Sequence, residues 1–316
     1  MLNEKKIKVT LIGLGSMGKN HLRILSILKN VEVHYIYDIN QETLDNISEQ
    51  YGVRATTDIN EAMTGADAVI ICSPTSLHFE HFMEASKHVK SIFVEKPIAH
   101  DIEKALKIKE ISEDQDIFVQ TGFIERFNPA VIELKSIVAK DRVINLDLTR
   151  TNKLSSRITD VDVILDLMIH DIDIALYLNG PVSKVKAYGA RENGLVAFAS
   201  AFIIHENGSF SRVLASRMTD KKIRSIQATC ENSFVNSDLL RKEIVVSMQS
   251  EINQKSGEAY VISSVEHQVE LRPQEALLVE LQSFIGSCLG EDIIVPDADA
   301  GVNALRICDE IQKEIL

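Results

Sequence analysis

A glycine-rich turn between an apolar strand and a helix constrains this chain more than any other feature. Residues 7–12 read Ile-Lys-Val-Thr-Leu-Ile, and the turn that follows has the spacing Gly13-x-Gly15-x-x-Gly18. The first glycine permits the tight turn, the second lets a pyrophosphate approach the backbone, and the third lets the helix pack on the strand. The helix N-terminus then presents free amide hydrogens to phosphate oxygens. The segment predicts a dinucleotide-binding turn, and the alternative is a tight turn with no ligand.

An acidic residue at the end of the next strand predicts which dinucleotide binds. The predicted strand 31–37 is followed by Asp38, which lies 20 residues beyond Gly18. A carboxylate there accepts hydrogen bonds from ribose hydroxyls and repels a 2′-phosphate. The following Ile39-Asn40-Gln41 offers no arginine that would hold such a phosphate. We therefore predict NAD in preference to NADP.

Strands and helices alternate through the first part of the chain. Continuous apolar strands such as Ala68–Cys72 are typical of a parallel sheet that helices cover on both faces. We expect an N-terminal doubly wound α/β domain over residues 1–121. The expected strands are 7–12, 31–37, 67–72, 91–95 and 116–120, and the expected helices are 17–29, 41–51, 59–64, 77–88 and 101–113.

The pattern changes after residue 121, where we expect a second domain, 122–316. A helix at 129–140 and a strand at 143–151 precede a long apolar helix, and several strand-like runs separated by turn signals follow between 182 and 248. Residues 195–204 and 209–216 flank Glu206-Asn207-Gly208 and predict a hairpin. These runs favour an α+β domain with an open, mostly antiparallel sheet, closed by helices at 274–289 and 298–316.

Two short motifs follow predicted strands at the edge of the parallel sheet where ligands bind. Ser73-Pro74-Thr75 with His78 comes after one strand, and Glu95-Lys96-Pro97 ends another. A lysine there can donate to a nicotinamide ribose and to a substrate hydroxyl, whereas Thr75 could simply cap a helix. The predicted cofactor contacts are Gly13, Gly15, Ser16, Met17, Gly18, Asp38, Ser73, Pro74, Thr75, His78, Glu95 and Lys96.

One polar stripe crosses the apolar helix predicted at 160–178. It consists of Asp162, Asp166, His170 and Asp173, whose spacings of 4, 4 and 3 place them on one helical face. Burying carboxylates and an imidazole among apolar neighbours is costly unless they have partners. The stripe is therefore either acid–base machinery or a structural histidine–carboxylate pair. Asp162 and Asp173 suit capping or ion pairing better than catalysis.

Taken in order, these motifs resemble the glucose–fructose oxidoreductase / inositol dehydrogenase / rhizopine catabolism (Gfo/Idh/MocA) family. The resemblance rests on the glycine-rich turn, the Ser73 motif, Glu95-Lys96-Pro97 and Asp166-x-x-x-His170, and it covers nearly the whole chain. It extends to the closing pattern Glu280…Phe284…Gly301…Ala304-Leu305-Arg306-Ile307. It implies a Rossmann domain, a substrate-binding and oligomerisation domain, and a homodimer or homotetramer.

The resemblance also implies catalytic roles. It assigns His170 as the base that takes a proton from a substrate hydroxyl, with Asp166 and Lys96 as partners in the proton relay. The family acts without a metal, so we expect no metal site. Among its members, the chain looks most like those that oxidise the 3-hydroxyl of UDP-N-acetylhexosamines or their uronic acids, such as UDP-N-acetylglucosamine 3-dehydrogenase.

Basic and polar side chains suggest how an anionic substrate would be held. Arg126 and Asn128 follow the fifth predicted strand, and Arg150 and Arg157 precede the stripe helix. Arginine suits carboxylates and phosphates, so we predict Arg126, Asn128 and Arg157 as substrate contacts and place Arg150 near the pocket mouth. The alternative is that these arginines make ordinary ion pairs.

Composition excludes several partners. The formal net charge is −12, which argues against general nucleic-acid binding. No apolar run approaches the length of a membrane span, and the start of the chain carries no apolar signal core, so we expect a cytoplasmic protein that does not bind membranes. Beside the sugar dehydrogenase, three alternatives stay open: an inositol, polyol or free-sugar dehydrogenase, an NAD-dependent glycosidase, and a non-catalytic NAD-binding sensor.

Overall fold

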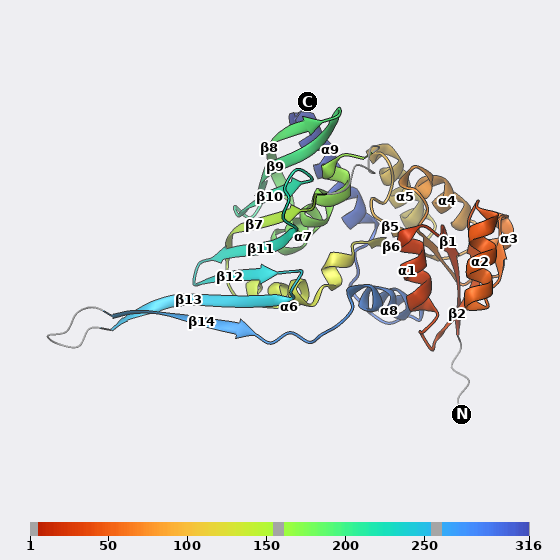
Figure 1. Cartoon of the computed structure of the whole chain (residues 1–316), viewed down its shortest axis with the longest axis horizontal. Coiled ribbons are helices and arrows are strands. Elements are labelled where there is room, and N and C mark those ends of the chain that lie inside the picture. The colour runs from red at the N-terminus through yellow and green to blue at the C-terminus, as the bar shows by residue number, and fades with distance from the viewer. Residues whose placement is uncertain (1–5, 154–160, 254–260, 316) are drawn as a thin grey trace. The chain divides into compact units, whose positions relative to one another are not determined.

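The chain forms two compact units in the computed structural model, which describes residues 6–153, 161–253 and 261–315. Each unit contains one β-sheet, and strands of both sheets are labelled in Figure 1. Unit 1 consists of Met1–Ile124 and Glu275–Arg306, and unit 2 consists of Glu125–Gln274 and Ile307–Leu316. The first boundary lies close to the predicted residue 121, but a late segment of the chain returns to unit 1.

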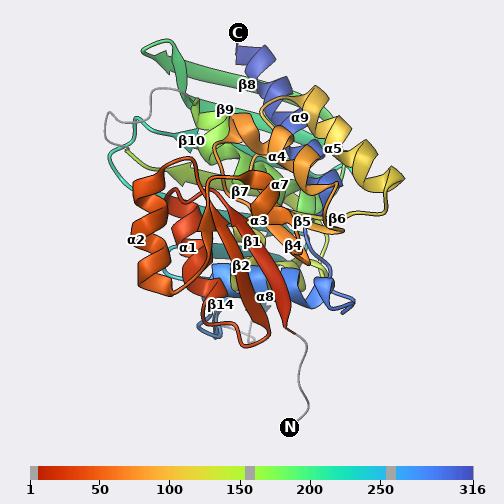
Figure 2. The ribbon, with the colours of Figure 1, turned by 90° about the vertical axis from the view of Figure 1, so that its right-hand side faces the viewer.

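Unit 1 is built on a six-stranded sheet with the order β3-β2-β1-β4-β5-β6. Its strands are β1 (Ile7–Ile12), β2 (Val31–Tyr37), β3 (Ala55–Thr56), β4 (Ala68–Ile71), β5 (Ser91–Glu95) and β6 (Phe118–Gly122). All neighbouring strands are parallel, and Figure 2 shows β1 and β2 side by side. The strand order reverses between β1 and β4, which is where ligands bind in folds of this kind.

Helices join these strands, and polar caps fix where several of them begin. They are α1 (Ser16–Leu25), α2 (Gln41–Tyr51), α3 (Ile59–Met63), the short 3-10 helix η1 (Thr75–Leu77), α4 (His78–Ala85) and α5 (Ile102–Asp114). Asn40 accepts a hydrogen bond from the amide of Thr43 at the start of α2, and Gly52 ends that helix with a φ of +65°. The predicted alternation of strands and helices is confirmed, and β3 is an additional short strand.

Helix α8 (Ala276–Cys288) packs in the core of unit 1, although the sequence analysis placed it in the second domain. Leu281 and Phe284 are fully buried there, and the ring of Phe284 lies 5.6 Å from that of Phe93 in β5. The apolar face of α8 showed that this helix must be covered. Its sequence could not show which sheet would cover it, because that depends on the path of the chain between the units.

Unit 2 contains an eight-stranded sheet with the order β14-β13-β12-β11-β7-β10-β9-β8. The strands are β7 (Val143–Thr151), β8 (Val182–Glu192), β9 (Leu195–His205), β10 (Phe210–Ser216), β11 (Ile223–Cys230), β12 (Ser233–Asp238), β13 (Glu243–Asn253) and β14 (Val261–Val269). Only β7 and β10 pair in parallel among its described neighbours. The predicted open, mostly antiparallel sheet and its β9–β10 hairpin are confirmed, and Figure 1 shows β13 and β14 as a long pair.

The helices of unit 2 cover one face of this sheet. They are α6 (Pro129–Val138), α7 (Ile169–Asn179) and the last part of α9 (Ala298–Ile315), which begins in unit 1. One π-helical turn, η3 (Ile164–Met168), leads into α7, so the predicted stripe helix is not a continuous α-helix. Such a turn changes the angular spacing of side chains, and it is frequently found at functional sites.

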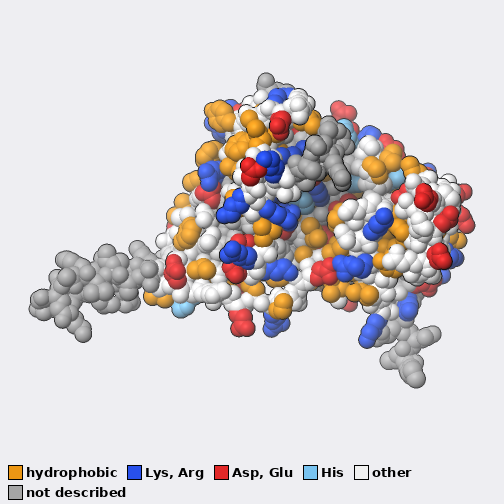
Figure 3. Space-filling model, in the orientation of Figure 1, with side chains coloured by type: hydrophobic (Ala, Val, Ile, Leu, Met, Phe, Trp, Pro, Cys, Tyr) orange, Lys and Arg blue, Asp and Glu red, His pale blue; other side chains and the backbone are white. Residues whose placement is uncertain are grey.

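Figure 3 shows acidic, basic and apolar side chains mixed across one face of the molecule. Within the described parts of the chain, we find no helix that is both long and apolar enough to cross a bilayer.

Candidate functional site

The predicted dinucleotide-binding residues surround a cavity of about 560 Å³ in unit 1. It opens beside the carboxyl ends of β1, β2, β4 and β5, as expected for this strand order. Its lining includes the predicted contacts Gly13, Gly15, Ser16, Met17, Asp38, Ser73, Pro74, Thr75, His78, Glu95 and Lys96. The remaining predicted contact, Gly18, lies behind the turn and is not part of this lining.

The three glycines of the turn have different surroundings. A Cβ on Gly18 would lie 1.9 Å from the carbonyl oxygen of Gly13, and Gly13 itself has a φ of +92°. No atom lies within 4 Å of a Cβ placed on Gly15, so that side of the turn is open. Helix α1 has neither a side-chain cap nor an acidic residue in its first turn. The open backbone and uncapped amides fit the pyrophosphate of a dinucleotide.

Asp38 holds the glycine-rich turn and also lines the cavity. Its Oδ2 accepts a hydrogen bond of 2.7 Å from the amide of Leu14, and its Oδ1 accepts one of 2.9 Å from the amide of Asn40. Each carboxylate oxygen has a second lone pair. Asp38 can therefore still accept hydrogen bonds from ribose hydroxyls while it fixes the turn that faces the phosphates.

Two histidines contact the Ser73 motif. The Nδ1 of His81 lies 2.8 Å from the hydroxyl oxygen of Ser73. His78 is 1% exposed, and its two ring nitrogens lie 2.8 Å from the carbonyl oxygen of Pro97 and 2.9 Å from that of Ser73. The polar atoms of His78 are thus directed at backbone, not at the cavity. No side-chain cap is present at η1 or α4, so Thr75 does not cap either helix.

Glu95 and Lys96 lie at the end of β5, and the bond from Lys96 to Pro97 is cis. Glu95 is buried, and its Oε1 lies 2.7 Å from the Nε2 of His21 in α1. The sulfur of Cys72 also lies within 4.8 Å of these two ligand atoms. Burial raises the pKa of Cys72 well above its usual value.

In unit 2, Asp166 and His170 are partly exposed while the apolar residues between them are buried. Asp166 accepts a hydrogen bond of 2.9 Å from Arg217, which follows β10. Arg217 also donates to the carbonyl oxygens of Val161 and Asp162, so it holds the chain just before the π-helical turn. The sequence analysis missed Arg217, because no local motif links it to the stripe helix 51 residues away.

The other acidic residues of the stripe have structural partners. Asp162 accepts hydrogen bonds from the amides of Ile164 and Leu165, as predicted for a capping residue. Asp173 is buried and forms a bidentate ion pair with Arg126 at 2.8 and 2.6 Å. Arg126 thus makes the kind of ion pair that the sequence left open as an alternative, and its contact with a substrate stays a prediction.

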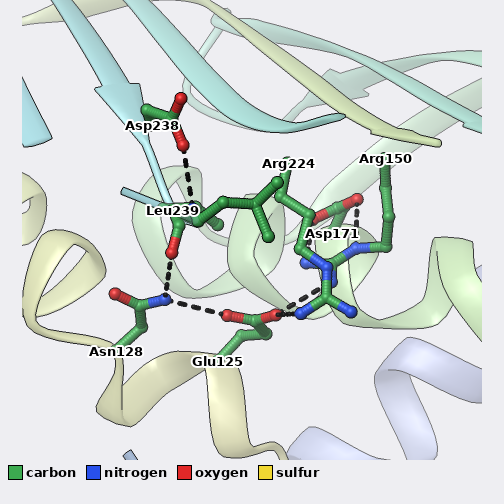
Figure 4. Close-up of polar contacts among 8 residues, drawn as sticks. Glu125, Asn128, Arg150, Asp171, Arg224, Asp238 and Leu239 are labelled. Atoms are coloured by element: carbon green, nitrogen blue, oxygen red, sulfur yellow. Dashed lines mark hydrogen bonds and ion pairs between the residues drawn. The ribbon is translucent and has the colours of Figure 1, made fainter. Parts of the chain in front are cut away.

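A buried charge network lies around the start of α7 (Figure 4). Arg150 of β7 donates to both oxygens of Asp171 at 2.9 and 2.8 Å and to Glu125 at 2.8 Å. Arg224 of β11 donates to the same oxygen of Glu125 at 3.2 Å. Because its side chain is 2% exposed, Arg150 does not lie at a pocket mouth, and that prediction is wrong. Two positive and two negative charges leave the network neutral.

Asn128 belongs to this same network and is buried. Its oxygen caps α6 by accepting a hydrogen bond from the amide of Ala130, and its nitrogen donates to Glu125 and to the carbonyl oxygen of Leu239. These bonds give Asn128 a structural role, and its predicted contact with a substrate stays a prediction. Arg157, the third predicted substrate contact, lies outside the described residues.

The parallel sheet, its strand order and the cavity lined by the glycine-rich turn define an NAD-binding oxidoreductase. Residues 7–123 match the model of an "Oxidoreductase family, NAD-binding Rossmann fold", and residues 139–235 match that of the "GFO/IDH/MocA C-terminal domain". The chain belongs to the GFO/IDH/MocA oxidoreductase family, as the sequence motifs predicted.

Characterised relatives are similar along almost the whole chain. The UDP-N-acetylglucosamine 3-dehydrogenase of Acidithiobacillus ferrooxidans is 26% identical over 98% of this chain and 97% of its own length. The NAD-dependent scyllo-inositol 2-dehydrogenase of Bacillus subtilis is also 26% identical, over 95% of this chain and 92% of its own. The solved structure of the A. ferrooxidans enzyme has the same fold, with a TM-score of 0.90, 23% identity and 98% coverage of both chains.

Proposed function

We propose that this protein transfers hydride between NAD and the C3 hydroxyl of a UDP-N-acetylhexosamine or its uronic acid. The observation that carries the proposal is the similarity to the A. ferrooxidans 3-dehydrogenase, which extends over 98% of this chain. The cavity with its open Gly15 backbone supports dinucleotide binding, and the partly exposed Asp166 and His170 support acid–base chemistry.

In the proposed reaction, His170 accepts the proton of the substrate hydroxyl. NAD, when bound, supplies the nicotinamide that takes the hydride from the same carbon. Asp166 favours the imidazolium form of His170 as the proton arrives, and Lys96 donates a hydrogen bond to the substrate oxygen. Arg217 keeps the carboxylate of Asp166 in place through their 2.9 Å hydrogen bond.

A second candidate is the oxidation of an inositol or another polyol by the same residues. It is supported by the inositol dehydrogenase of B. subtilis, which is as identical to this chain as the nucleotide-sugar dehydrogenase is. The substrate contacts would separate the two candidates, and Arg126 and Asn128, which favoured an anionic substrate, also have partners within the protein. We retain a nucleotide sugar as the proposed substrate because the similarity to the A. ferrooxidans 3-dehydrogenase extends over 98% of this chain.

Absorbance at 340 nm during turnover tests the proposal. We expect NADH to form from NAD when the protein is given a UDP-N-acetylhexosamine or its uronic acid, but not when it is given inositols or free sugars. Formation of NADH with inositol alone would support the proposed mechanism but contradict the proposed substrate. Release of free sugar from a glycoside without net NADH would identify a glycosidase, and a protein that binds NAD but never reduces it would be a sensor.

We propose that NAD is preferred over NADP because Asp38 lies on the cavity wall. A 2′-phosphate beside this carboxylate would bring two like charges together without an arginine to offset them. We expect the Kd for NADH, measured by its fluorescence, to be at least about tenfold lower than that for NADPH, which corresponds to about 1.4 kcal/mol. Replacing Asp38 by asparagine should narrow this ratio, and equal affinities in the unaltered protein would contradict the assignment.

We further propose a homodimer or homotetramer that forms through the open face of the unit 2 sheet. The strand register places Ile204, Phe210 and Phe234 on this face, and each is more than a third exposed. A row of exposed apolar side chains is typical of an interaction surface, and the mass of the protein in solution tests it. A cytoplasmic location is supported by the free thiols of Cys72, Cys230 and Cys288.

A further inference from the structure

Buried polar contacts hold the backbone immediately before Lys96. The side chain of Glu95 turns back toward its own strand, and its Oε2 accepts a hydrogen bond of 3.2 Å from the amide of Lys96. The other oxygen lies 2.7 Å from the Nε2 of His21, which is fully buried. An ionised carboxylate only accepts hydrogen bonds, so an ionised Glu95 that binds both Lys96 and His21 requires the proton of the imidazole to lie on Nε2.

The space around Glu95 leaves its carboxylate little freedom. Glu95 pairs with Gly122 of β6, and a Cβ on Gly122 would lie 2.8 Å from Oε2 of Glu95. The Nδ1 of His21 is buried and has no hydrogen-bond partner among the described residues, so Glu95 is the polar contact that this imidazole makes. Helix α1 and strands β5 and β6 thus meet at the peptide that leads into Lys96.

A second histidine holds the backbone immediately after Lys96. The Nδ1 of His78 lies 2.8 Å from the carbonyl oxygen of Pro97, and its Nε2 lies 2.9 Å from that of Ser73. A carbonyl oxygen only accepts hydrogen bonds, so Nδ1 must carry a proton to hold Pro97. A neutral imidazole with its proton on Nδ1 donates to Pro97, and only the imidazolium form would also donate to Ser73. The loop after β4 and the loop after β5 both line the cavity.

We propose that His21 and His78 are positioning residues that fix the Lys96 peptide from both sides. His21 acts through Glu95 on the amide of Lys96, and His78 acts through the carbonyl oxygen of Pro97. The inference rests on the proposed function, because it takes Lys96 to be the residue that contacts the substrate oxygen. Lysine has a long flexible side chain, and a displacement of about 1 Å in a reacting group can lower turnover roughly 10²-fold.

Matched amide substitutions test the proposal, because the nitrogen of asparagine overlays Nδ1 of histidine and that of glutamine overlays Nε2. At position 78, His78→Asn keeps a donor for Pro97 and His78→Gln keeps one for Ser73. At position 21, His21→Gln keeps the donor for Glu95 and His21→Asn does not. We expect kcat to be roughly tenfold or more higher for H78N than for H78Q, and for H21Q than for H21N.

The proposal favours asparagine at position 78 and glutamine at position 21. If the histidines had a purely structural role, kcat would follow the thermal stability of each variant and would not show this opposite preference. Equal kcat within each pair, at equal Tm, would overturn the proposal. The variant Lys96→Met separates this failure from failure of the proposed function. If Lys96→Met retains full turnover, the proposed role of Lys96 is wrong. If Lys96→Met has no turnover while kcat is equal within each histidine pair, only the positioning role of His21 and His78 is wrong.

A measurement on the unaltered protein keeps the proposal testable even if the variants do not fold. Nitrogen-15 NMR of histidine side chains reports which ring nitrogen carries a proton. We expect a protonated Nδ1 at His78 and a protonated Nε2 with an unprotonated Nδ1 at His21. An unprotonated Nδ1 at His78 would exclude its bond to Pro97 and overturn the proposal without reference to catalysis.

Discussion

Replacing His170 by alanine should lower kcat by roughly 10²–10⁴-fold, the usual contribution of a general base. The imidazole is partly exposed on the first turn of α7, where it can meet a substrate hydroxyl, and no other described histidine lies on that helix. The cavity for NAD is lined by residues of unit 1 alone, so the Kd for NADH should not change. Steady-state kinetics with the active sugar and NADH fluorescence measure the two quantities.

The matched control is His88→Ala, which removes an exposed histidine that follows α4. Its kcat should stay within about threefold of the unaltered protein, since a surface substitution changes little. A His170→Ala protein with unaltered kcat would remove His170 from the proposed mechanism. Loss of NADH binding together with kcat would instead show that the substitution had disturbed unit 1.

Replacing Arg150 by methionine should lower the free energy of unfolding by about 3–5 kcal/mol, the cost of removing one partner from a buried ion pair. Methionine would leave the carboxylates of Glu125 and Asp171 close together without the guanidinium that bridges them. Equilibrium unfolding in urea measures the loss. The exposed pair of Arg142 and Glu231 provides the control, and Arg142→Met should cost at most about 1 kcal/mol. Equal losses in the two variants would contradict the structural role of Arg150.

One member of this network, Glu125, makes a contribution to stability that depends on pH, whereas burial raises the pKa of Asp171 and gives that residue the opposite effect. Burial raises the pKa of Glu125, but the charges of Arg150 and Arg224 outweigh it and hold the pKa below its ordinary value. In acid the unfolded chain then binds the proton of Glu125 more readily than the folded chain does, so this contribution is lost as the pH falls through the folded-state pKa. The Arg150→Met variant should lose less of its remaining stability over that range, which urea unfolding at a series of pH values would measure.

The strands and turns that were predicted correctly are those whose formation depends on residues close together in the sequence. The apolar run of β4 and the glycine turn at Gly13 depend on neighbours along the chain, and the parallel sheet followed from them. The π-helical turn at Ile164–Met168 was not predicted, because its residues have the same apolar pattern as an ordinary helix. Tertiary packing selects such a turn, and a single helical period cannot reveal it.

Charged side chains were the least predictable part of the site. Arg150, Arg126 and Arg217 each have a carboxylate partner at least 21 residues away in sequence. An arginine in a sequence indicates that an anion will be bound, but it does not distinguish a substrate from an aspartate of the same chain. The sequence could thus predict Asp166 and His170 as a pair, whereas the arginine that holds Asp166 had to come from the structure.

The return of α8 to unit 1 means that this unit is not a continuous piece of chain. Leu281 and Phe284 complete a core whose other members, such as Phe93, are translated much earlier. The gap from Ile124 to Ala276 is 276 − 124 = 152 residues, which takes a ribosome roughly 8–30 s. During that interval the apolar surface under α8 faces solvent or a chaperone. A nascent chain of this protein therefore finishes its first-made unit almost last.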